Sequence, residues 1–307
     1  MLDPTLAMQL SKYGLLAGLI LIALATVCYT LVLALGRASR QAPVKTHAGR
    51  ATGGGGVATA ELTRPPASST PPRALAQYGT YFTWLGLAFL TACLFFLTVG
   101  TGHGPFTNQY EFSVSFAWGI LLAYVYFEHK YHVRTIGLLV LPIAAAFLLY
   151  ALSMGASANP LVPALQNPPL LITHIVVAVL AYGAFSISFA AAVLYLAQPE
   201  GGKAGLPKPA LLDEMGYRAV IIAFPLMTLT VVIGGLWAEK AWGTYWSWDP
   251  KETASLITWL IYGAYLHARV ARGWVGRRAA WLLVLGFTSV LFTFFGNLFF
   301  GGLHSYA

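Results

Sequence analysis

Long runs of apolar residues occupy most of this 307-residue chain and constrain its fold more than any other feature. Each run is roughly 20 residues long, which is the length a helix needs to cross the ~30 Å hydrocarbon core of a bilayer. Only 9% of the residues are charged and the mean hydropathy is +0.68, whereas a soluble domain carries about 25% charged residues. We therefore expect an all-α polytopic membrane protein with about eight transmembrane helices, near residues 13–35, 78–100, 112–127, 135–153, 170–196, 217–237, 253–268 and 279–300.

Basic residues gather in alternate connections between these runs. Fifteen of the 18 follow the first, third, fifth and seventh runs, while Lys12, Lys240 and Lys251 lie on the other side. The positive-inside rule makes the crowded side cytoplasmic. We predict that the protein lies in the inner (cytoplasmic) membrane with both termini on the outer, periplasmic side. The net charge of +8 then reflects this topology and not the binding of nucleic acid.

Residues 36–77 interrupt the apolar pattern with Gly53-Gly54-Gly55-Gly56 and two Pro-Pro pairs. Such a composition cannot bury a core, so it predicts a flexible cytoplasmic linker. The linker divides an N-terminal transmembrane helix, residues 1–35, from a seven-helix domain, residues 78–307. The first run is too long for a signal peptide, and its arginines follow it instead of preceding it.

Tryptophan is concentrated in the connection between the sixth and seventh runs, residues 237–253, which holds Trp237, Trp242, Trp246 and Trp248. One or two tryptophans at a membrane edge are ordinary, because the indole is apolar with one polar N–H. Four within twelve residues, with a tyrosine and a glycine between them, instead predict a flat aromatic shelf on the outer face. Such a shelf suits a large planar ligand.

Two helix starts can be predicted from local sequence. Asn167 followed by Pro168 supplies an N-cap and then a proline in the first turn. Asp249 and Pro250 do the same for the seventh helix, and Glu252 stands where a capping box requires a carboxylate. The acidic residues of the tryptophan loop thus have a complete structural explanation.

Two histidines flank the tryptophan loop on the predicted outer side, and neutral imidazole is the usual axial ligand of haem iron. His174 lies seven residues beyond Asn167, about 10 Å into the fifth helix, and His304 follows the outer end of the eighth. Each alone is explained by a hydrogen-bonded histidine at a helix end. Their coincidence with four tryptophans favours a site in which both bind one metalloporphyrin.

His267 lies eighteen residues beyond Asp249, roughly 27 Å along the seventh helix and toward its cytoplasmic end. An ionisable residue at membrane depth suggests function, although an interfacial position beside Arg269 explains it nearly as well. No second histidine of the chain is clearly placed to pair with it. His129, His132 or a partner subunit are the candidates.

Three segments resemble a known family. Residues 242–253 (Trp-Gly-Thr-Tyr-Trp-Ser-Trp-Asp-Pro-Lys-Glu-Thr) resemble the WWD signature of haem-handling proteins in cytochrome c maturation. Residues 265–269 (Tyr-Leu-His-Ala-Arg) and 302–306 (Gly-Leu-His-Ser-Tyr) are similar to motifs of the CcsA (ResC) family of System II. The resemblance covers about residues 80–307.

This resemblance implies a transient haem b site on the outer face, with His174 and His304 as axial ligands of the iron. It implies that His267 is a ligand within the membrane whose partner histidine comes from the CcsB (ResB) subunit. The chain would then be the haem-binding subunit of a cytochrome c synthase (haem lyase) that acts with CcsB. We expect it to present haem to the CxxCH motif of apocytochrome c for thioether attachment, with Trp237, Trp242, Trp246, Trp248 and Asp249 around the haem.

The chain holds two cysteines, Cys28 and Cys93, and neither belongs to a CxxC pair. A separate thioredoxin-like protein must therefore reduce the substrate thiols.

Lys240 and Lys251 are candidates to bind the haem propionates. Three alternatives remain at this point: a haem-handling protein of the CcmC or CcmF type, a b-type cytochrome of electron transfer, and a solute transporter with structural histidines.

Overall fold

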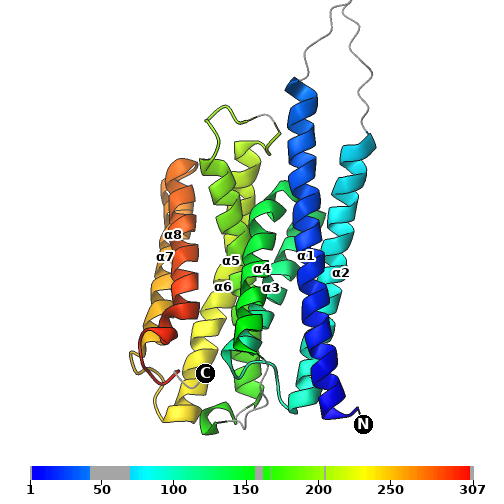
Figure 1. The fold of residues 1–307 in the computed structure, drawn as a ribbon. Coiled ribbons are helices and arrows are strands. Elements are labelled where there is room, and N and C mark those ends of the chain that lie inside the picture. Colours follow the sequence, from blue (N-terminus) through cyan, green and yellow to red (C-terminus); the bar gives the residue numbers. More distant parts are fainter. Residues whose placement is uncertain (1, 42–69, 156–161, 167, 204, 305–307) are drawn as a thin grey trace, which may run out of the picture.

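The computed structural model describes residues 2–41, 70–155, 162–166, 168–203 and 205–304. These residues form eight long helices. The helices run alternately up and down through one bundle (Figure 1). The helices are α1 (Pro4–Gln41), α2 (Thr70–Thr101), α3 (Gln109–Tyr131), α4 (Gly137–Met154), α5 (Pro168–Leu196), α6 (Pro209–Trp242), α7 (Pro250–Arg272) and α8 (Arg277–Phe295). Short 3₁₀ turns occur at Arg134–Ile136, Pro163–Leu165 and Gly296–Leu298. The predicted all-α fold is confirmed.

Seven of the eight helices are long and apolar enough to cross a membrane, so this is a multi-pass membrane protein. The exception is α7, which has 23 residues and therefore a length of about 35 Å. Its length is sufficient, but Lys251 and Glu252 at one end and Arg269 and Arg272 at the other lower its hydropathy. The helix expected near residues 253–268 is thus present, with charged ends beyond an apolar centre.

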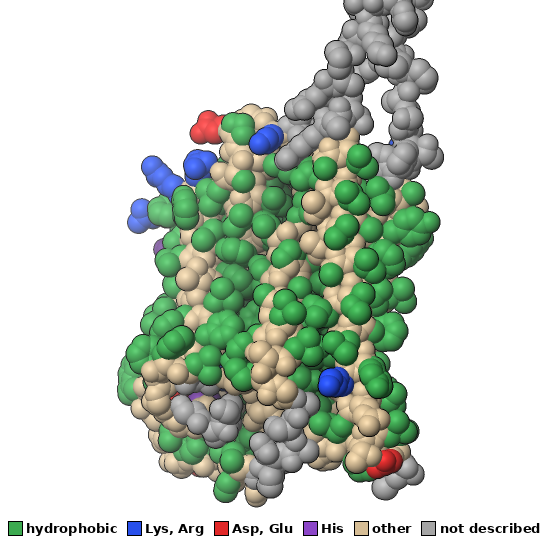
Figure 2. Space-filling model, viewed as in Figure 1, with side chains coloured by type: hydrophobic (Ala, Val, Ile, Leu, Met, Phe, Trp, Pro, Cys, Tyr) green, Lys and Arg blue, Asp and Glu red, His purple; other side chains and the backbone are tan. Residues whose placement is uncertain are grey.

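The two ends of the bundle differ in charge. The start of α1, the α6–α7 connection and the end of α8 lie at one end, which we call the tryptophan-loop end (the bottom of Figure 1). Figure 2 shows apolar side chains over the middle of the visible face and basic side chains gathered toward the opposite end. The expected alternation of the connections is therefore present in the fold.

The N-terminal helix α1 packs along α2 and also against α4. The close approach of α1 and α2 depends on glycine at position 18, because a Cβ there would lie 2.8 Å from the Leu90 side chain. Leu15 and Ile22 of α1 are fully buried in the core that the other helices share. This packing was not predicted, since a long linker separates the two helices along the chain. Most of that linker, residues 42–69, lies outside the described residues.

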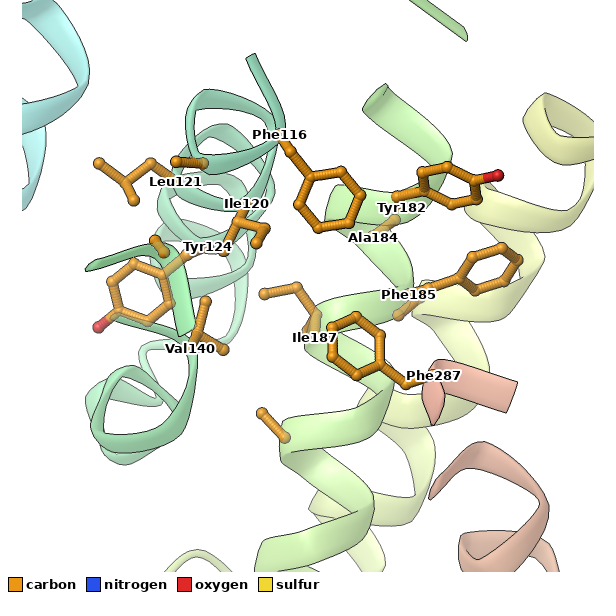
Figure 3. Packing of buried hydrophobic residues seen from close by; sticks show 14 of the residues in the cluster. Phe116, Ile120, Leu121, Tyr124, Val140, Tyr182, Ala184, Phe185, Ile187 and Phe287 are labelled. Carbon is orange, nitrogen blue, oxygen red and sulfur yellow. The ribbon is translucent and has the colours of Figure 1, made fainter. Parts of the chain in front are cut away.

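The core that positions the other helices is built on a close crossing of α3 and α5. A Cβ on Gly183 would overlap the carbonyl of Gly119, so both positions need glycine for the backbones to approach. Around the crossing, Figure 3 shows Phe116 of α3 beside Tyr182 of α5. Phe185 of α5 lies over the Tyr262 ring of α7, with ring centroids 3.6 Å apart and planes 9° from parallel. The helix that carries His174 is therefore fixed against the helix that follows the tryptophan loop.

Candidate functional site

A cavity at the tryptophan-loop end is lined by residues of α3, α5, α6, α7 and α8, of the α6–α7 connection and of the segment after α8. Its empty space is about 1050 Å³, including the part open to solvent. Apolar side chains form most of the wall, and its prominent residues include His174, Trp237, Tyr245, Trp246, Lys251 and His304.

His174 enters this cavity from the second turn of α5. Its Nδ1 lies 2.9 Å from the carbonyl oxygen of Thr230 in α6. A carbonyl oxygen only accepts hydrogen bonds, so Nδ1 must carry the proton and donate it. The other ring nitrogen, Nε2, then keeps its lone pair and can bind a metal.

The ring of His174 fits against α6 because residue 234 is glycine. A Cβ at Gly234 would lie 2.7 Å from Cε1 of the imidazole, and one at Gly235 would lie 3.3 Å from the backbone oxygen of Tyr245. A Gly-Gly pair inside an apolar helix is a sequence signal for such a close approach. The prediction from motifs missed it, because the pair precedes the tryptophan-rich segment.

His304 reaches the same cavity from the segment after α8. Its Nδ1 lies 2.8 Å from Oδ1 of Asp249, whose side chain is 2% exposed. Burial opposes ionisation of Asp249, but the hydrogen bond and charge of His304, together with the backbone N–H of Lys251, outweigh it and lower the pKa to about 2. The carboxylate therefore accepts and Nδ1 of His304 donates, so that Nε2 carries the lone pair that a metal would bind.

Burial also lowers the pKa of His304, in spite of the opposing effect of Asp249. The imidazole is consequently neutral near pH 7, which is the form that binds iron. A hydrogen bond from neutral imidazole to carboxylate is a common support of a metal-ligating histidine, because it fixes both the tautomer and the ring orientation.

Asp249 has a second function as the N-cap of α7. Its Oδ1 accepts from the backbone N–H of Lys251 at 2.9 Å, and Oε2 of Glu252 accepts from the backbone N–H of Asp249 at 3.2 Å. The predicted capping box is therefore confirmed. The same carboxylate that begins α7 also orients His304, and the local sequence pattern had no means of revealing this contact across 55 positions.

Trp237 contacts the rings of both histidines. It is 2% exposed and donates from Nε1 to the carbonyl oxygen of Ala164 at 3.2 Å. Its ring centroid lies 6.1 Å from that of His174, with planes 12° apart, and 5.8 Å from that of His304. Trp242 contacts His304 edge to face at 4.8 Å. The structure thus brings together His174, His304 and two of the predicted tryptophans.

The other two tryptophans form a separate pair. Trp246 lines the cavity, whereas Trp248 is 69% exposed and has a positive φ of 59°. Their rings meet at 90°, and those of Trp237 and Trp242 meet at 72°. The expectation of one flat shelf is therefore wrong, because edge-to-face contacts are favourable for aromatic pairs and turn neighbouring rings across one another.

His267 is not part of this cavity. It lies on an exposed stripe of α7 with Ile257, Leu260, Ala264 and Ala271. These positions recur every three or four residues and so share one face of the helix. Among the described residues, no hydrogen bond or ring contact involves His267.

The remaining histidines lie elsewhere. His129 and His132 are exposed at the end of α3, where their ring centroids lie 6.5 Å apart. His103 bonds the carbonyl oxygen of Gly104 in the α2–α3 connection. His47 and Asn167, the predicted cap of α5, lie outside the described residues.

The residues of the cavity differ in their suitability for a bare metal ion and for the iron of a porphyrin. Within the described ranges, no cluster of three or more histidine, cysteine or acidic residues is placed to hold a bare metal ion. Two imidazoles with Nδ1 bonded to the protein leave Nε2 as the nitrogen that could bind a metal, and neutral imidazole is a usual ligand of porphyrin iron.

Comparison with known proteins places the chain in a family. Residues 106–304 match the Cytochrome C assembly protein family. The chain is 38% identical over 257 residues to the "Cytochrome c biogenesis protein CcsA" of Guillardia theta, a match that covers 75% of this chain and 84% of that protein. The protein of the same name from Gloeobacter violaceus is 34% identical, with 76% and 87% covered. The chain belongs to the cytochrome c assembly protein family, CcsA branch, as its sequence motifs predicted.

A solved structure shares the fold. The chain aligns with "Cytochrome c Heme Lyase CcmF" at a TM-score of 0.60 and 19% identity, over 96% of this chain and 47% of that one. This likeness concerns the arrangement of helices alone, and the chain spans about half the length of that protein. Family membership assigns the chain to cytochrome c biogenesis, in preference to b-type electron transfer or solute transport.

Proposed function

We propose that the chain holds haem b at the tryptophan-loop end and presents it to apocytochrome c for covalent attachment. One observation carries this proposal. Two histidines 130 positions apart each engage Nδ1 with a protein acceptor, Thr230 or Asp249, and so keep the metal-binding lone pair on Nε2 at a shared cavity. A role at a helix end alone does not explain why two distant histidines have the same hydrogen-bond pattern at one cavity.

The residues around the iron have distinct functions. His174 and His304 supply the axial nitrogens, and two such ligands leave no iron position for oxygen. Trp237 packs against both imidazoles, and Trp242 packs edge to face against His304. Trp246 lines the cavity wall, and Trp248, which packs against Trp246, is exposed where an incoming protein segment would meet it.

Attachment adds the two thiols of CxxCH to the two haem vinyls. In each addition a carbon–sulfur bond forms, the vinyl double bond becomes single, and the thiol hydrogen passes to the terminal vinyl carbon, so no net oxidation occurs. The substrate histidine then replaces one axial imidazole and releases the product. We assign catalysis of this step to orientation of the reactants and exclusion of competing reactions.

His267 fits a second haem position shared with another subunit. A polar ring on an outward-facing stripe of a membrane helix is costly unless another protein covers it. The other exposed residues of the stripe are apolar or small, which suits packing against a helix. We propose that CcsB (ResB) covers this face and supplies the second imidazole, with a thioredoxin-like protein providing reduced thiols on the substrate.

The proposed orientation follows from charge. Apart from Lys12, Lys240 and Lys251, the basic residues of the described part lie toward the end opposite the tryptophan loop, so we assign that end to the cytoplasm and the loop to the periplasmic side of the inner membrane. Haem made in the cytoplasm would then meet His267 before it reaches His174 and His304.

The test is co-expression with CcsB and a CxxCH substrate. His174→Ala and His304→Ala should each abolish holocytochrome formation, and imidazole in the medium should restore part of it by filling the vacated iron position. His129→Ala is the matched control and should retain full yield. Full yield from the His174→Ala, His304→Ala double variant without imidazole would overturn the proposed outer site.

A further inference from the structure

Four histidine, lysine or glutamate side chains line the cavity, and three already have partners within the protein. His174 and His304 bond Thr230 and Asp249. Oε2 of Glu252 accepts from the backbone N–H of Ser247 at 2.8 Å, from the Ser247 hydroxyl at 3.1 Å and from the backbone N–H of Asp249. The fourth side chain, that of Lys251, is the exception.

Lys251 lines the cavity and, among the described residues, forms no ion pair. Its Nζ lies 4.8 Å from the centroid of the Phe112 ring, and within the described part of the chain it has no carboxylate within 4.0 Å. Burial lowers the pKa of Lys251 to about 8, against a raising effect of Asp249, so the group still carries its charge near pH 7. A partly buried cation without an anionic partner is costly.

Lys240 offers a direct contrast beside the same loop. Its side chain is 61% exposed, and its Nζ lies 3.4 Å from Oε2 of Glu239. It does not line the cavity. Of the two lysines near the tryptophans, one therefore has a partner in the protein and the other is directed to the space where a ligand would lie.

We propose that Lys251 binds a carboxylate of the ligand in this cavity, namely a haem propionate, and thereby sets which edge of the porphyrin faces outward. This inference rests on the proposed function. Haem carries both propionates on one edge and both vinyls on the other rings. Anchoring the propionate edge at Lys251 fixes the vinyls relative to the cavity mouth, so that the substrate thiols meet the vinyls in one orientation.

The experiment compares haem with its dimethyl ester, in which the two propionates are neutral. The purified full chain is titrated with each and followed by its Soret spectrum. Wild-type protein should bind haem at least tenfold more tightly than the ester. Lys251→Met should lose about tenfold or more in haem affinity and bind the ester as wild type does, while Lys251→Arg retains the preference for haem.

Lys240→Met is the matched control and should leave both affinities unchanged. Binding of the ester with a bis-imidazole spectrum shows that Lys251→Met is folded, so a loss confined to haem cannot come from misfolding. The propionate contact is overturned if Lys251→Met leaves the preference intact, or if both ligands lose affinity equally. Failure of the proposed function has a different result, because wild type would then show no bis-imidazole spectrum with either ligand.

Discussion

Nδ1 of His304 donates a hydrogen bond to Oδ1 of Asp249 over 2.8 Å, and this contact joins the segment after α8 to the first turn of α7. The same carboxylate caps the helix. The aspartate of the tryptophan loop therefore couples a helix start to the orientation of a proposed iron ligand, and its two functions can be separated by substitution.

Asp249→Asn separates them. Asparagine caps a helix about as well as aspartate, so α7 should remain folded. The amide is a weaker acceptor than a carboxylate, and loss of such a supporting group costs about 10- to 100-fold in metal affinity. We expect haem affinity to fall by this factor, with a Soret titration as the measurement and circular dichroism as the control for folding. Unchanged affinity would show that Asp249 acts only as a cap.

The pH dependence of haem binding should follow His304. Because burial holds its pKa below the ordinary value of 6.5, the folded protein keeps this imidazole neutral down to a lower pH than an exposed histidine. Protons then compete with iron only below about pH 6.5, so affinity should not fall as the pH decreases from about 8 to 6.5 and should fall below that range. Asp249, with a pKa of about 2, stays ionised throughout. Affinity that already falls between about pH 8 and 7 would contradict a neutral, buried ligand.

Gly234→Ala tests how closely the His174 ring packs against α6. A Cβ there would lie 2.7 Å from Cε1 of the imidazole, closer than such contacts allow, so the ring must move. Gly235→Ala is the matched control, since its Cβ meets a backbone oxygen at 3.3 Å and leaves the histidine alone. Both changes raise intrinsic helix propensity by about 1 kcal/mol. We expect only Gly234→Ala to weaken haem binding, while the thermal stability of both variants is kept.

Much of the fold could be predicted because membrane helices follow local rules. Apolar length located the spans, and Asp249, Pro250 and Glu252 were enough to place the start of α7. The contact of Asp249 with His304 could not be found in this way, because it depends on how distant helix ends meet. The tilt of Trp237 against Trp242 depends likewise on packing around His304.

The packing of α1 could not be predicted from the sequence for the same reason. Its apolar sequence is equally compatible with a helix surrounded by lipid and with one buried against α2, and only the complementary surfaces of Gly18 and Leu90 decide between them.

A polar cluster should hold α1 to the body of the protein. Glu128 of α3 is 6% exposed and accepts from the hydroxyl of Tyr29 in α1 at 3.0 Å, from Nε of Arg134 at 3.3 Å and from Thr80 of α2. After cleavage at a protease site inserted within residues 42–69, α1 should still co-purify with the rest. Glu128→Ala leaves buried donors without an acceptor, at a cost of roughly 1–3 kcal/mol, and should release more α1. Quantitative release from the otherwise unchanged protein would contradict the packing.

The exposed stripe of α7 leads to the last prediction, which concerns the partner. If CcsB covers this face, a bulky residue beside His267 should block it without reaching the cavity that holds His174. Ala264→Trp places an indole on the stripe next to His267, and should abolish co-purification of CcsB. Leu229→Trp adds the same side chain at a position of α6 that is also exposed, at 46%, and should keep the partner. Because the cavity is untouched, both variants should bind haem at His174 and His304 with the wild-type Soret spectrum. Retention of CcsB by Ala264→Trp would place the partner on another face of the protein. The polar ring of His267 would then face lipid, which the cost of removing it from water disfavours.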